Sequence, residues 1–422
     1  MLFFITYQVI QILLLPFFVI FLFLRKIKRK PVFGSFKERF GLIPKSPTNK
    51  KIIWIQAVSV GEVLSIQDLI NKIKKEIPDS FCYLTVGTLS GKKIAQNKKI
   101  GDQISFLPYD LLPLMYLAYK RIKPFKIIIA EADIWPNFLY LAKLKKIPLF
   151  IINARMNDKS KNKYHKFRFI FKNLFNIAQK IFTQSEKDTN EFKILGVKKN
   201  KLETLGNIKI PNVLEKQKNT ILPKINLNYP ILLAGSIHTG EMDIYINLFK
   251  KLKITFSNLK IIIAPRHFHW QEELLEKLRL SQINFISWQD KYCNITIIEK
   301  LNNFDALIVL KLGELFNLYP FCNIFFLGGT FVPIGGHNLL EPAAWSKLSI
   351  IGPYDSNCRV IADELEKNNG LIRVKNENEL FIQTKNLLEN KKYIYMGKNA
   401  HDWLEKEAKI VNAKLNNFIE EL

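Results

Sequence analysis

Residues 327–341 read LGGTFVPIGGHNLLE, and they follow an apolar run that is typical of a buried parallel strand. The next residues, PAAWSKL at 342–348, predict the first turns of a helix. A strand, two glycine pairs and a helix start form the geometry in which backbone N–H groups cradle a phosphate. The loop also carries His337, Asn338 and Glu341, so hydrogen-bonding side chains stand where the backbone is most open. A glycine-rich turn with a helix-capping asparagine is the competing interpretation of this loop taken alone.

Outward from this loop, short apolar runs alternate with amphipathic stretches, which indicates parallel α/β sheets. The polar stretch Pro211–Tyr229 interrupts the alternation and predicts a linker, while Lys392–Glu420 has a helical pattern. The sequence therefore predicts two doubly wound, Rossmann-like domains that face a cleft, and ligands of such sheets bind at the carboxyl ends of the strands. The predicted strands are Lys51–Gln56, Phe81–Val86, Gln103–Leu107, Ile127–Ala130, Leu149–Ile152, Lys180–Gln184, Pro230–Ala234, Leu259–Ile263, Ile295–Ile298, Ala306–Val309, Asn323–Leu327, Ser349–Ile351 and Leu371–Val374. The expected segments are 1–25 (anchor helix), 30–210 (N-terminal domain), 211–229 (linker), 230–391 (C-terminal domain) and 392–422 (a helix that crosses back to the N-terminal domain).

The N-terminal segment differs from the rest of the chain. Residues 2–24 contain no charged side chain, and RKIKRK follows at 25–30. Such a run is long enough to cross a bilayer as a helix, and Pro16 would only kink it. A secretory signal has its basic residues before the apolar core, so the order here favours an uncleaved anchor, either single-pass or interfacial. The basic cluster places the following domains in the cytoplasm by the positive-inside rule.

The chain of 422 residues carries a formal net charge of +26, which has two interpretations. Lysine is abundant together with Ile and Asn, as biased base composition produces across a proteome. The other interpretation is attraction to an anionic surface, such as membrane lipid headgroups or a phosphorylated lipid. Nucleic acid is not expected as a partner, because no RNA- or DNA-binding module signature appears.

The sequence gives no reason to expect a metal. Its four cysteines have no CxxC spacing, so they indicate neither a zinc site nor a disulfide framework, and a reducing compartment is expected. The histidines His267 and His269 have an HxH spacing, but no third ligand follows at a usable distance along the chain.

Carboxylates follow two strands of the N-terminal domain. The first strand ends in AVSVGE, which places Glu62 at a helix start beside Ser59 and Gly61. A buried strand then delivers Glu131 and Asp133 to the same kind of sheet edge. Like charges gathered there would raise the pKa of Glu62 and suit it to act as a general base. The alternative is that Glu62 only complements the positive end of its helix, which would lower its pKa.

Cationic and glycine-containing segments suit a phosphate-bearing ligand. Arg155 follows a strand of the first domain, Lys209 lies just before the linker, and Pro265-Arg266 ends a strand of the second domain. Each is a surface charge in the competing interpretation, but an arginine at a strand end beside a proline favours an anion contact. The loops 234–241 and 312–315 add backbone amides and, with Ser236, His238 and Glu314, polar side chains. The second domain is therefore predicted to bind a nucleotide phosphate, and the first to supply acid–base chemistry.

Taken together and in this order, the motifs resemble the bacterial 3-deoxy-D-manno-octulosonic acid (Kdo) transferases, membrane-anchored GT-B glycosyltransferases of lipopolysaccharide synthesis. The resemblance spans nearly the whole chain, including the apolar N-terminus. The matching motifs are AVSVGE at 57–62, LPYD at 107–110, EADIWPN at 131–137, NARM at 153–156, GNIK at 206–209, AGSIHTGE at 234–241, APRH at 264–267, LGEL at 312–315 and GGHNLLEPAA at 335–344.

This resemblance implies inverting transfer of Kdo from CMP-Kdo to a lipid A precursor (lipid IVA) at the bacterial inner membrane, with no metal or other cofactor. It implies that Glu62 is the general base and that Glu131 and Lys209 stabilise the transition state. The residues that would hold CMP are Pro265, Arg266, Gly313, Glu314, Leu315, Asn338, Leu339, Leu340 and Glu341. Further candidate site residues are Ser59, Gly61, Asp133, Arg155, Ser236, His238, Gly335, Gly336 and His337.

The chain departs from the family pattern at three places. Gln56 stands where the family usually has His, Ala132 and Asp133 replace Thr and Glu, and the stretch after residue 156 is rich in lysine instead of arginine. None of these changes removes a residue assigned to chemistry, so any effect is expected on acceptor preference.

Two other functions remain as alternatives. A GT-B transferase for another nucleotide sugar would share the fold, but it would not be expected to share AVSVGE and EADIWPN together. A non-catalytic, basic membrane-surface protein would be expected to have lost at least one of Glu62, Glu131, Lys209 and Arg266.

Overall fold

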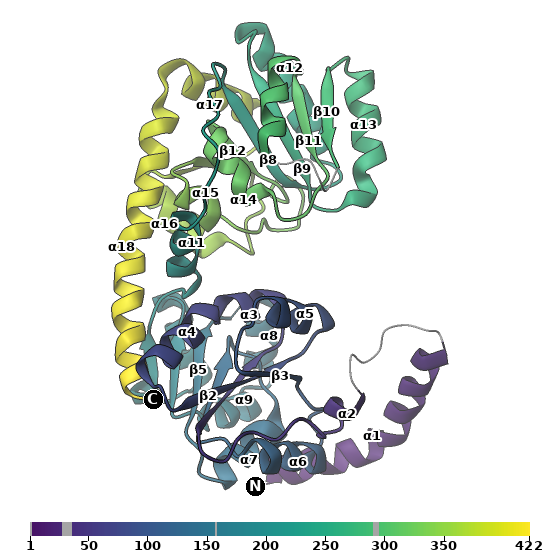
Figure 1. Cartoon of the computed structure of the whole chain (residues 1–422), viewed down its shortest axis with the longest axis vertical. Coiled ribbons are helices and arrows are strands. Elements are labelled where there is room, and N and C mark those ends of the chain that lie inside the picture. Colours follow the sequence, from purple (N-terminus) through teal and green to yellow (C-terminus); the bar gives the residue numbers. More distant parts are fainter. Residues whose placement is uncertain (1, 28–35, 157, 290–294) are drawn as a thin grey trace. The chain divides into compact units, whose positions relative to one another are not determined.

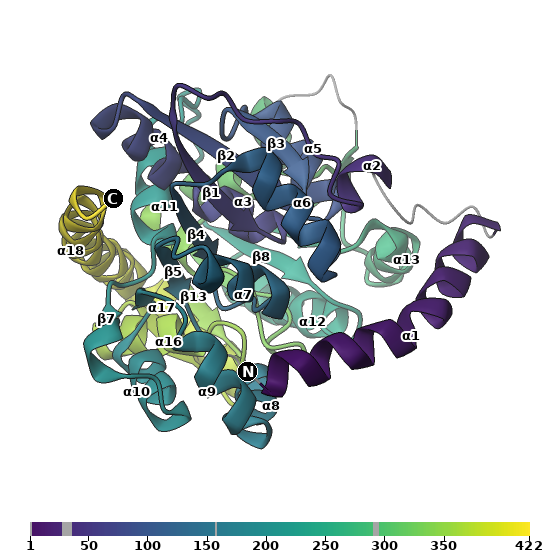
Figure 2. The same cartoon turned by 90° about the horizontal axis from the view of Figure 1, so that it is seen from below.

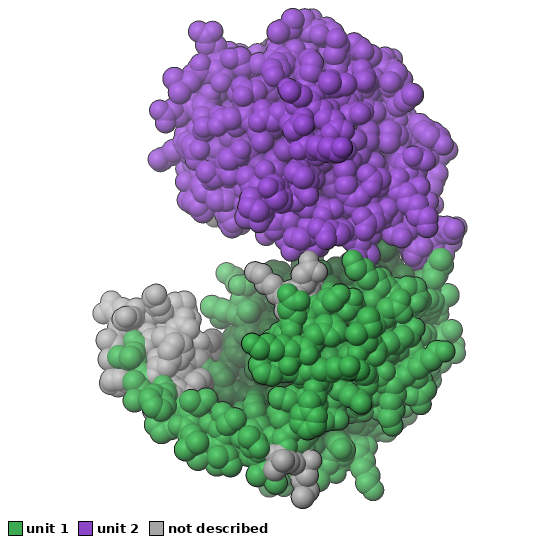
Figure 3. Space-filling view, turned by 180° about the vertical axis from the view of Figure 1, so that it is seen from behind, with its two compact units in different colours: residues 1–212, 410–422 green, residues 213–409 purple. Residues whose placement is uncertain are grey.

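The computed structural model describes residues 2–27, 36–156, 158–289 and 295–422 (Figure 1). The chain forms two compact units, residues 1–212 with 410–422 and residues 213–409, which Figure 3 colours separately. In the described residues each unit is built on a seven-stranded sheet whose strands all pair in parallel. The predicted pair of doubly wound α/β domains is therefore confirmed.

The sheet of the first unit has the order β3-β2-β1-β4-β5-β6-β7, so the direction of winding changes between β1 and β4. Its strands are β1 (Lys51–Ala57), β2 (Ser80–Val86), β3 (Gln103–Phe106), β4 (Lys126–Ala130), β5 (Leu149–Ala154), β6 (Lys180–Thr183) and β7 (Leu202–Thr204). Its helices are α1 (Leu2–Ile27), α2 (Phe36–Arg39), α3 (Val60–Ser65), α4 (Gln67–Glu76), α5 (Leu89–Asn97), α6 (Leu112–Ile122), α7 (Pro136–Leu144), α8 (Asp158–Lys166), α9 (Arg168–Phe175), α10 (Glu186–Leu195) and the 3-10 helix η1 (Lys199–Lys201).

Both faces of this sheet are buried, which explains why its strands are almost continuously apolar. Alternate residues of β1 point to opposite cores: Trp54 lies in one, and Ile53 and Ile55 lie in the other. Helices α6, α7, α9 and α10 supply the first core, and Figure 2 shows α6 and α7 beside strands of this sheet. The second core includes α4 and the C-terminal part of α18 (Lys392–Glu420).

The sheet of the second unit has the order β10-β11-β9-β8-β12-β13-β14, with β8 and β12 adjacent at the change of direction. Its strands are β8 (Ile231–Ile237), β9 (Lys260–Pro265), β10 (Phe285–Trp288), β11 (Ala306–Val309), β12 (Ile324–Leu327), β13 (Leu348–Ile351) and β14 (Leu371–Arg373). Its helices are α12 (Met242–Thr255), η2 (Phe268–Trp270), α13 (Gln271–Leu280), η3 (Ile295–Asn302), α14 (Leu315–Leu318), η4 (Tyr319–Phe321), α15 (Leu340–Ala344), α16 (Arg359–Lys367) and α17 (Glu377–Asn390), while α11 (Lys209–Lys218) and α18 run from one unit to the other.

Three secondary-structure predictions need correction. The apolar run Ile295–Ile298 is the start of the 3-10 helix η3 and not a strand. The edge strands β10 and β7 were not predicted, because their half-buried residues give no strong apolar signal. The expected linker 211–229 is helical in its first part, where α11 continues to Lys218.

The N-terminal segment forms the helix α1, which packs against α7 in the first unit (Figure 2). Within the residues that the structure describes, no helix combines the length and apolar character needed to cross a membrane.

Candidate functional site

Glu62 lies where β1 leads into α3, and it completes a capping box with Ser59. The Ser59 hydroxyl accepts a hydrogen bond from the Glu62 N–H at 3.3 Å. In return, the carboxylate of Glu62 accepts hydrogen bonds from the N–H groups of Val58 at 2.7 Å and Ser59 at 3.2 Å. The side chain is buried at the end of the strand, with 8% of its surface exposed. A Cβ at Gly61 would meet nothing closer than 3.9 Å, so packing around this turn does not require glycine there.

The pKa of Glu62 is raised above its ordinary value. Burial is the largest cause, and the charges of Glu131 and Asp133 raise it further, while the hydrogen bonds from Ser59 and Val58 lower it. Desolvation is thus a larger effect on the pKa of Glu62 than the neighbouring carboxylates expected from the sequence. The capping role and a raised pKa therefore coexist in one residue.

Glu131 follows β4 and connects the two cationic residues of this edge. Its carboxylate is 3.1 Å from the Lys209 Nζ and 3.6 Å from the Arg155 Nε. Its backbone has a left-handed φ of 58°, which is unfavourable for a side chain with a Cβ and is concentrated at functional sites. Asp133, close by, accepts a hydrogen bond from the Trp135 indole, and burial raises its pKa. The structure thus brings the predicted residues of the first domain together.

Sequence reasoning missed Asn153, which positions the segment that carries Lys209. Asn153 is fully buried at the end of β5 with a φ of 59°. Its side-chain oxygen accepts a hydrogen bond from the Ile208 N–H at 3.3 Å, and the Asn207 side chain accepts one from the Lys209 N–H at 3.0 Å. The motifs NARM and GNIK, far apart in sequence, therefore act as one support for Lys209.

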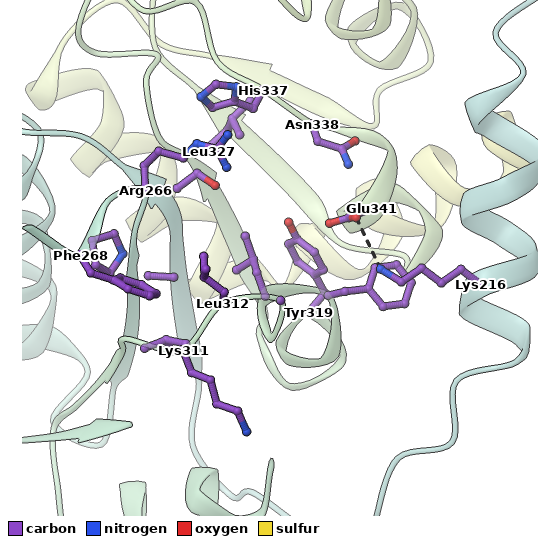
Figure 4. Close-up of a pocket in the computed structure, with 17 residues that line it drawn as sticks. Lys216, Arg266, Phe268, Lys311, Leu312, Tyr319, Leu327, His337, Asn338 and Glu341 are labelled. Carbon is purple, nitrogen blue, oxygen red and sulfur yellow. Dashed lines mark ion pairs between the residues drawn. The ribbon is translucent and has the colours of Figure 1, made fainter. Parts of the chain in front are cut away.

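The second unit contains a cavity of about 320 Å³ at the carboxyl ends of its strands. Figure 4 shows Arg266 and His337 at one side of this cavity and the ion pair between Lys216 and Glu341 at the other. The Lys216 Nζ lies 3.7 Å from Glu341 and 3.5 Å from the centre of the Phe316 ring. Burial raises the pKa of Glu341, and Lys216 lowers it. The cavity has the size of a ligand pocket and contains both cationic and aromatic side chains.

The cavity collects most of the residues predicted to bind a nucleotide, but not all of them. Leu339 and Leu340 are buried, and the Leu340 N–H donates a hydrogen bond to the Asn338 side chain. The predicted residues that line the cavity are Ser236, Pro265, Arg266, Gly313, Leu315, His337, Asn338 and Glu341. The predicted residues of this unit that do not line the cavity are His238, Glu314, Gly335, Gly336, Leu339 and Leu340. Lining residues that the sequence did not indicate include Lys216, Phe268, Lys311, Phe316 and Tyr319. Lys216 was missed because it lay in the segment expected to be a linker.

The loops of this edge are held by Glu241, which is fully buried. Its carboxylate accepts hydrogen bonds from four backbone N–H groups, those of His238, Gly329, Thr330 and Phe331, at 2.7–3.0 Å. Gly335 and Gly336 have positive φ values, and a Cβ at Gly335 would lie 2.3 Å from the Ser356 hydroxyl, so glycine is required there. The Glu241 carboxylate thus fixes the start of the glycine-rich loop through its backbone N–H groups, and Gly335 packs closely against Ser356.

Among the described residues, no group of three or more His, Cys, Asp or Glu side chains is placed to hold a metal ion. This includes His267 and His269, whose rings stack on each other.

Comparison with known proteins places this chain among glycosyltransferases. A sequence family described as 3-deoxy-D-manno-octulosonic-acid transferase (kdotransferase) matches residues 34–212. A 3-deoxy-D-manno-octulosonic acid transferase from Aquifex aeolicus is 31% identical over 354 residues, which are 84% of this chain and 90% of that protein. A bifunctional glycosyltransferase/methyltransferase from Fusobacterium nucleatum is also 31% identical, over 82% of this chain, and this chain spans 53% of that longer protein. In fold, the chain is similar to UDP-GlcNAc 2-epimerase from Neisseria meningitidis bound to UDP-GlcNAc, with a TM-score of 0.60, 15% identity and coverage of 87% of this chain and 100% of that one.

The two doubly wound units, one with an acid–base cluster and the other with a cationic cavity at its strand ends, have the GT-B architecture, and the relatives make the chain a glycosyltransferase of this class. Within this class, the 31% identity to the Aquifex aeolicus transferase, over 90% of that protein's length, indicates transfer of 3-deoxy-D-manno-octulosonic acid. The chain belongs to the family of 3-deoxy-D-manno-octulosonic acid transferases.

Proposed function

We propose that this protein transfers Kdo from CMP-Kdo to a lipid A precursor of the lipid IVA type, with inversion at the anomeric carbon and without a metal or other cofactor. The observation that carries the proposal is the grouping of Glu62, Glu131 and Lys209 at one edge of the first sheet. Membership of the Kdo transferase family supports the choice of sugar.

Glu62 is the proposed general base. Its carboxylate takes the proton of the acceptor hydroxyl, the resulting oxygen attacks the anomeric carbon, and the bond from that carbon to the phosphate oxygen breaks to release CMP. A single displacement of this kind inverts the anomeric centre. The two backbone hydrogen bonds to Glu62 leave lone pairs free, because a carboxylate has about four acceptor sites. Its raised pKa makes it a stronger base than an ordinary glutamate.

Lys209 supplies positive charge next to this base, and Glu131 fixes its position. The salt bridge of 3.1 Å holds the Lys209 ammonium, while Arg155 on the other carboxylate oxygen restrains Glu131. A preorganised cation stabilises negative charge that develops in the transition state.

CMP is the proposed occupant of the second unit's cavity. Arg266 would contact the phosphate, and Glu341 would accept hydrogen bonds from ribose hydroxyls. Phe316 and Tyr319 form an aromatic part of the wall that suits the base.

We propose that the protein acts at the cytoplasmic face of the inner membrane, with α1 at the interface. Large apolar side chains of α1, including Ile12, Leu13 and Phe17, are exposed, and the sequence after α1 is basic. This combination is typical of helices that lie in the headgroup region of anionic membranes.

The direct test is mass spectrometry of tetraacylated lipid A precursor after incubation with the purified protein and freshly generated CMP-Kdo. A mass gain in units of Kdo is expected with the wild type, also in the presence of a chelator, and not with Glu62→Ala. Lack of gain despite measurable CMP binding would contradict the proposal and favour another sugar or acceptor on the same fold.

A further inference from the structure

Four of the six histidines of the chain gather at one place in the second unit, although they come from three separate segments. The His238 ring lies 5.8 Å from that of His337 and 6.1 Å from that of His267, measured between ring centres. His269 completes the group, 5.4 Å from His267, and Trp270 packs against three of the four rings. No catalytic role proposed above uses these side chains.

His238 is the buried member of this cluster, with 8% of its surface exposed. Its backbone N–H is fixed by Glu241, and its ring lies against Gly329, where a Cβ would approach to 3.3 Å. Among the described residues, the His238 Nε2 has no hydrogen-bond partner. A buried polar nitrogen in a fixed position without a partner is costly unless a ligand or water completes it.

The cluster adjoins the nucleotide cavity on the side of Arg266. Arg266 and His337 line the cavity, as Figure 4 shows, whereas His238 and His267 do not. The charges of Arg266 and His267 act on both His238 and His337. The carboxylate of Glu241, whose charge acts on His238, is already occupied by four backbone N–H groups. The positive charge of Arg266 beside the two rings disfavours a metal cation and favours an anion.

A second anion is present in the donor that we propose. Kdo is a 2-keto sugar acid, so its carboxylate is bonded to the anomeric carbon, the same atom that carries the phosphate ester. The carboxylate must therefore lie beside the phosphate, just outside the space that the nucleotide fills. We propose that His238 and His337, next to Arg266, form the subsite that recognises the carboxylate of the donor sugar acid. This inference rests on the proposed function.

Binding of the carboxylate is expected to be linked to proton uptake. Partial burial lowers the pKa of both histidines, and Arg266 and His267 lower it further, while Glu241 raises that of His238. The free imidazoles are thus neutral near pH 7, and a carboxylate beside them raises their pKa and favours the protonated form. Affinity for CMP-Kdo should consequently fall with rising pH more steeply than affinity for CMP.

The test compares CMP with CMP-Kdo in the full-length protein. His238→Ala and His337→Ala are expected to raise the KM for CMP-Kdo by roughly ten- to a hundredfold, because each removes a hydrogen bond to a charged group, and to change the Kd for CMP less than about threefold. His238→Gln should restore part of the loss, since its amide can donate from nearly the same place. His269→Ala is the matched control, because it removes an exposed ring of the same cluster that packs against His267 and Trp270 and is not part of the proposed subsite.

Other results overturn the assignment. If the variants bound CMP and CMP-Kdo more weakly by the same factor, the histidines would contact the phosphate instead of the carboxylate. An unchanged KM for CMP-Kdo in His337→Ala would exclude the proposed subsite, even if His238→Ala disturbs packing. A wild-type protein that binds CMP but gains no affinity or turnover from the sugar acid would overturn both the subsite and the proposed donor.

Discussion

Glu62 combines two functions that are usually assigned to different residues. Its carboxylate closes the capping box of α3 through the N–H groups of Val58 and Ser59, and burial at the strand end raises its pKa. The cap fixes the carboxylate in place, and desolvation makes it basic. A short helix of six residues thus orients the proposed general base.

Replacing Glu62 with Ala should reduce kcat by roughly 10²- to 10⁴-fold, because a positioned general base contributes about that factor. Loss of the cap should lower the free energy of unfolding by only about 1 kcal/mol. Transfer measured by mass spectrometry, CMP binding by calorimetry and a thermal melt separate the two effects. Ser59→Ala is the matched control, because it removes the hydroxyl of the same capping box and keeps the base; a comparable loss of kcat there would indicate a structural role.

The raised pKa of Glu62 predicts the acid side of the pH–rate profile. The base must be ionised, so kcat should rise with pH through a pKa above that of an ordinary glutamate. Asp133→Asn should move this limb to lower pH, since it removes one of the charges that raise the pKa. A limb that stays in place in Asp133→Asn would mean that another group limits the rate.

Replacing Arg266 with Ala should weaken CMP binding by roughly ten- to a hundredfold, because it removes a charged donor from the cavity. Arg279→Ala on the exposed side of α13 is the matched control and should leave the Kd unchanged. Calorimetric titration with CMP gives both values. Equal affinity in Arg266→Ala and wild type would exclude Arg266 from the phosphate site.

At the scale of elements, α1 exposes many apolar side chains and turns polar ones toward the first unit, the reverse of an ordinary surface helix. Its polar side chains Tyr7 and Gln11 turn inward to the buried Asp110 at the start of α6, while apolar side chains face outward. Asp110 also accepts hydrogen bonds from the N–H groups of Asn137 and Phe138 in α7, both at 3.0 Å. The motifs LPYD and WPN therefore meet in one polar contact that fixes α1.

Replacing Asp110 with Ala should destabilise the protein by about 2–5 kcal/mol, because two buried N–H donors of α7 lose their partner. Burial raises the pKa of Asp110 to about 7. The folded protein then holds a proton that the unfolded chain releases near pH 4, so stability should fall as pH rises from about 4 to about 7.

Melting curves over this pH range measure both effects, and the slope should be smaller in Asp110→Ala. Asp102→Ala, which removes another carboxylate of the same unit, is the comparison variant. A slope that is unchanged in Asp110→Ala would assign the titration to another group.

At the scale of the whole molecule, the C-terminal helix completes the core of the first unit. Val411, Leu415, Phe418 and Ile419 of α18 are buried with the strands of that unit's sheet. A Cβ at Gly206 would lie 2.5 Å from a methyl group of Val411, so α18 also packs on the loop that leads to Lys209. Val411 of α18 thus packs against the segment that carries Lys209, which lies about two hundred residues earlier in the chain.

Phe418→Ala should destabilise the protein by about 3–5 kcal/mol, since its fully packed ring contacts the rings of Phe150 and Phe182. Asn417→Ala, exposed on the same turn of α18, should have little effect. Thermal unfolding of the two variants provides the comparison. Similar melting temperatures would show that the C-terminal end of α18 does not belong to this core.

The sequence alone determined the two parallel sheets and the residues at their carboxyl edges. Long apolar runs buried on both faces, such as β4, have one stable arrangement, and polar residues that follow them must lie at a sheet edge. Short, half-buried segments were predicted less well: β7 and β10 were missed and η3 was assigned as a strand. The cleft between the domains and the roles of the site residues stay predictions.

Only the tertiary structure decided which edge residues meet. It paired Lys209 with Glu131, placed Lys216 against Glu341, gathered four histidines beside Arg266 and joined Asp110 to α1. These contacts link segments far apart in the chain, and their formation depends on how helices and loops pack above each strand. Local periodicity reports whether a side chain faces a core, whereas partners across a site depend on packing that no short stretch of sequence contains.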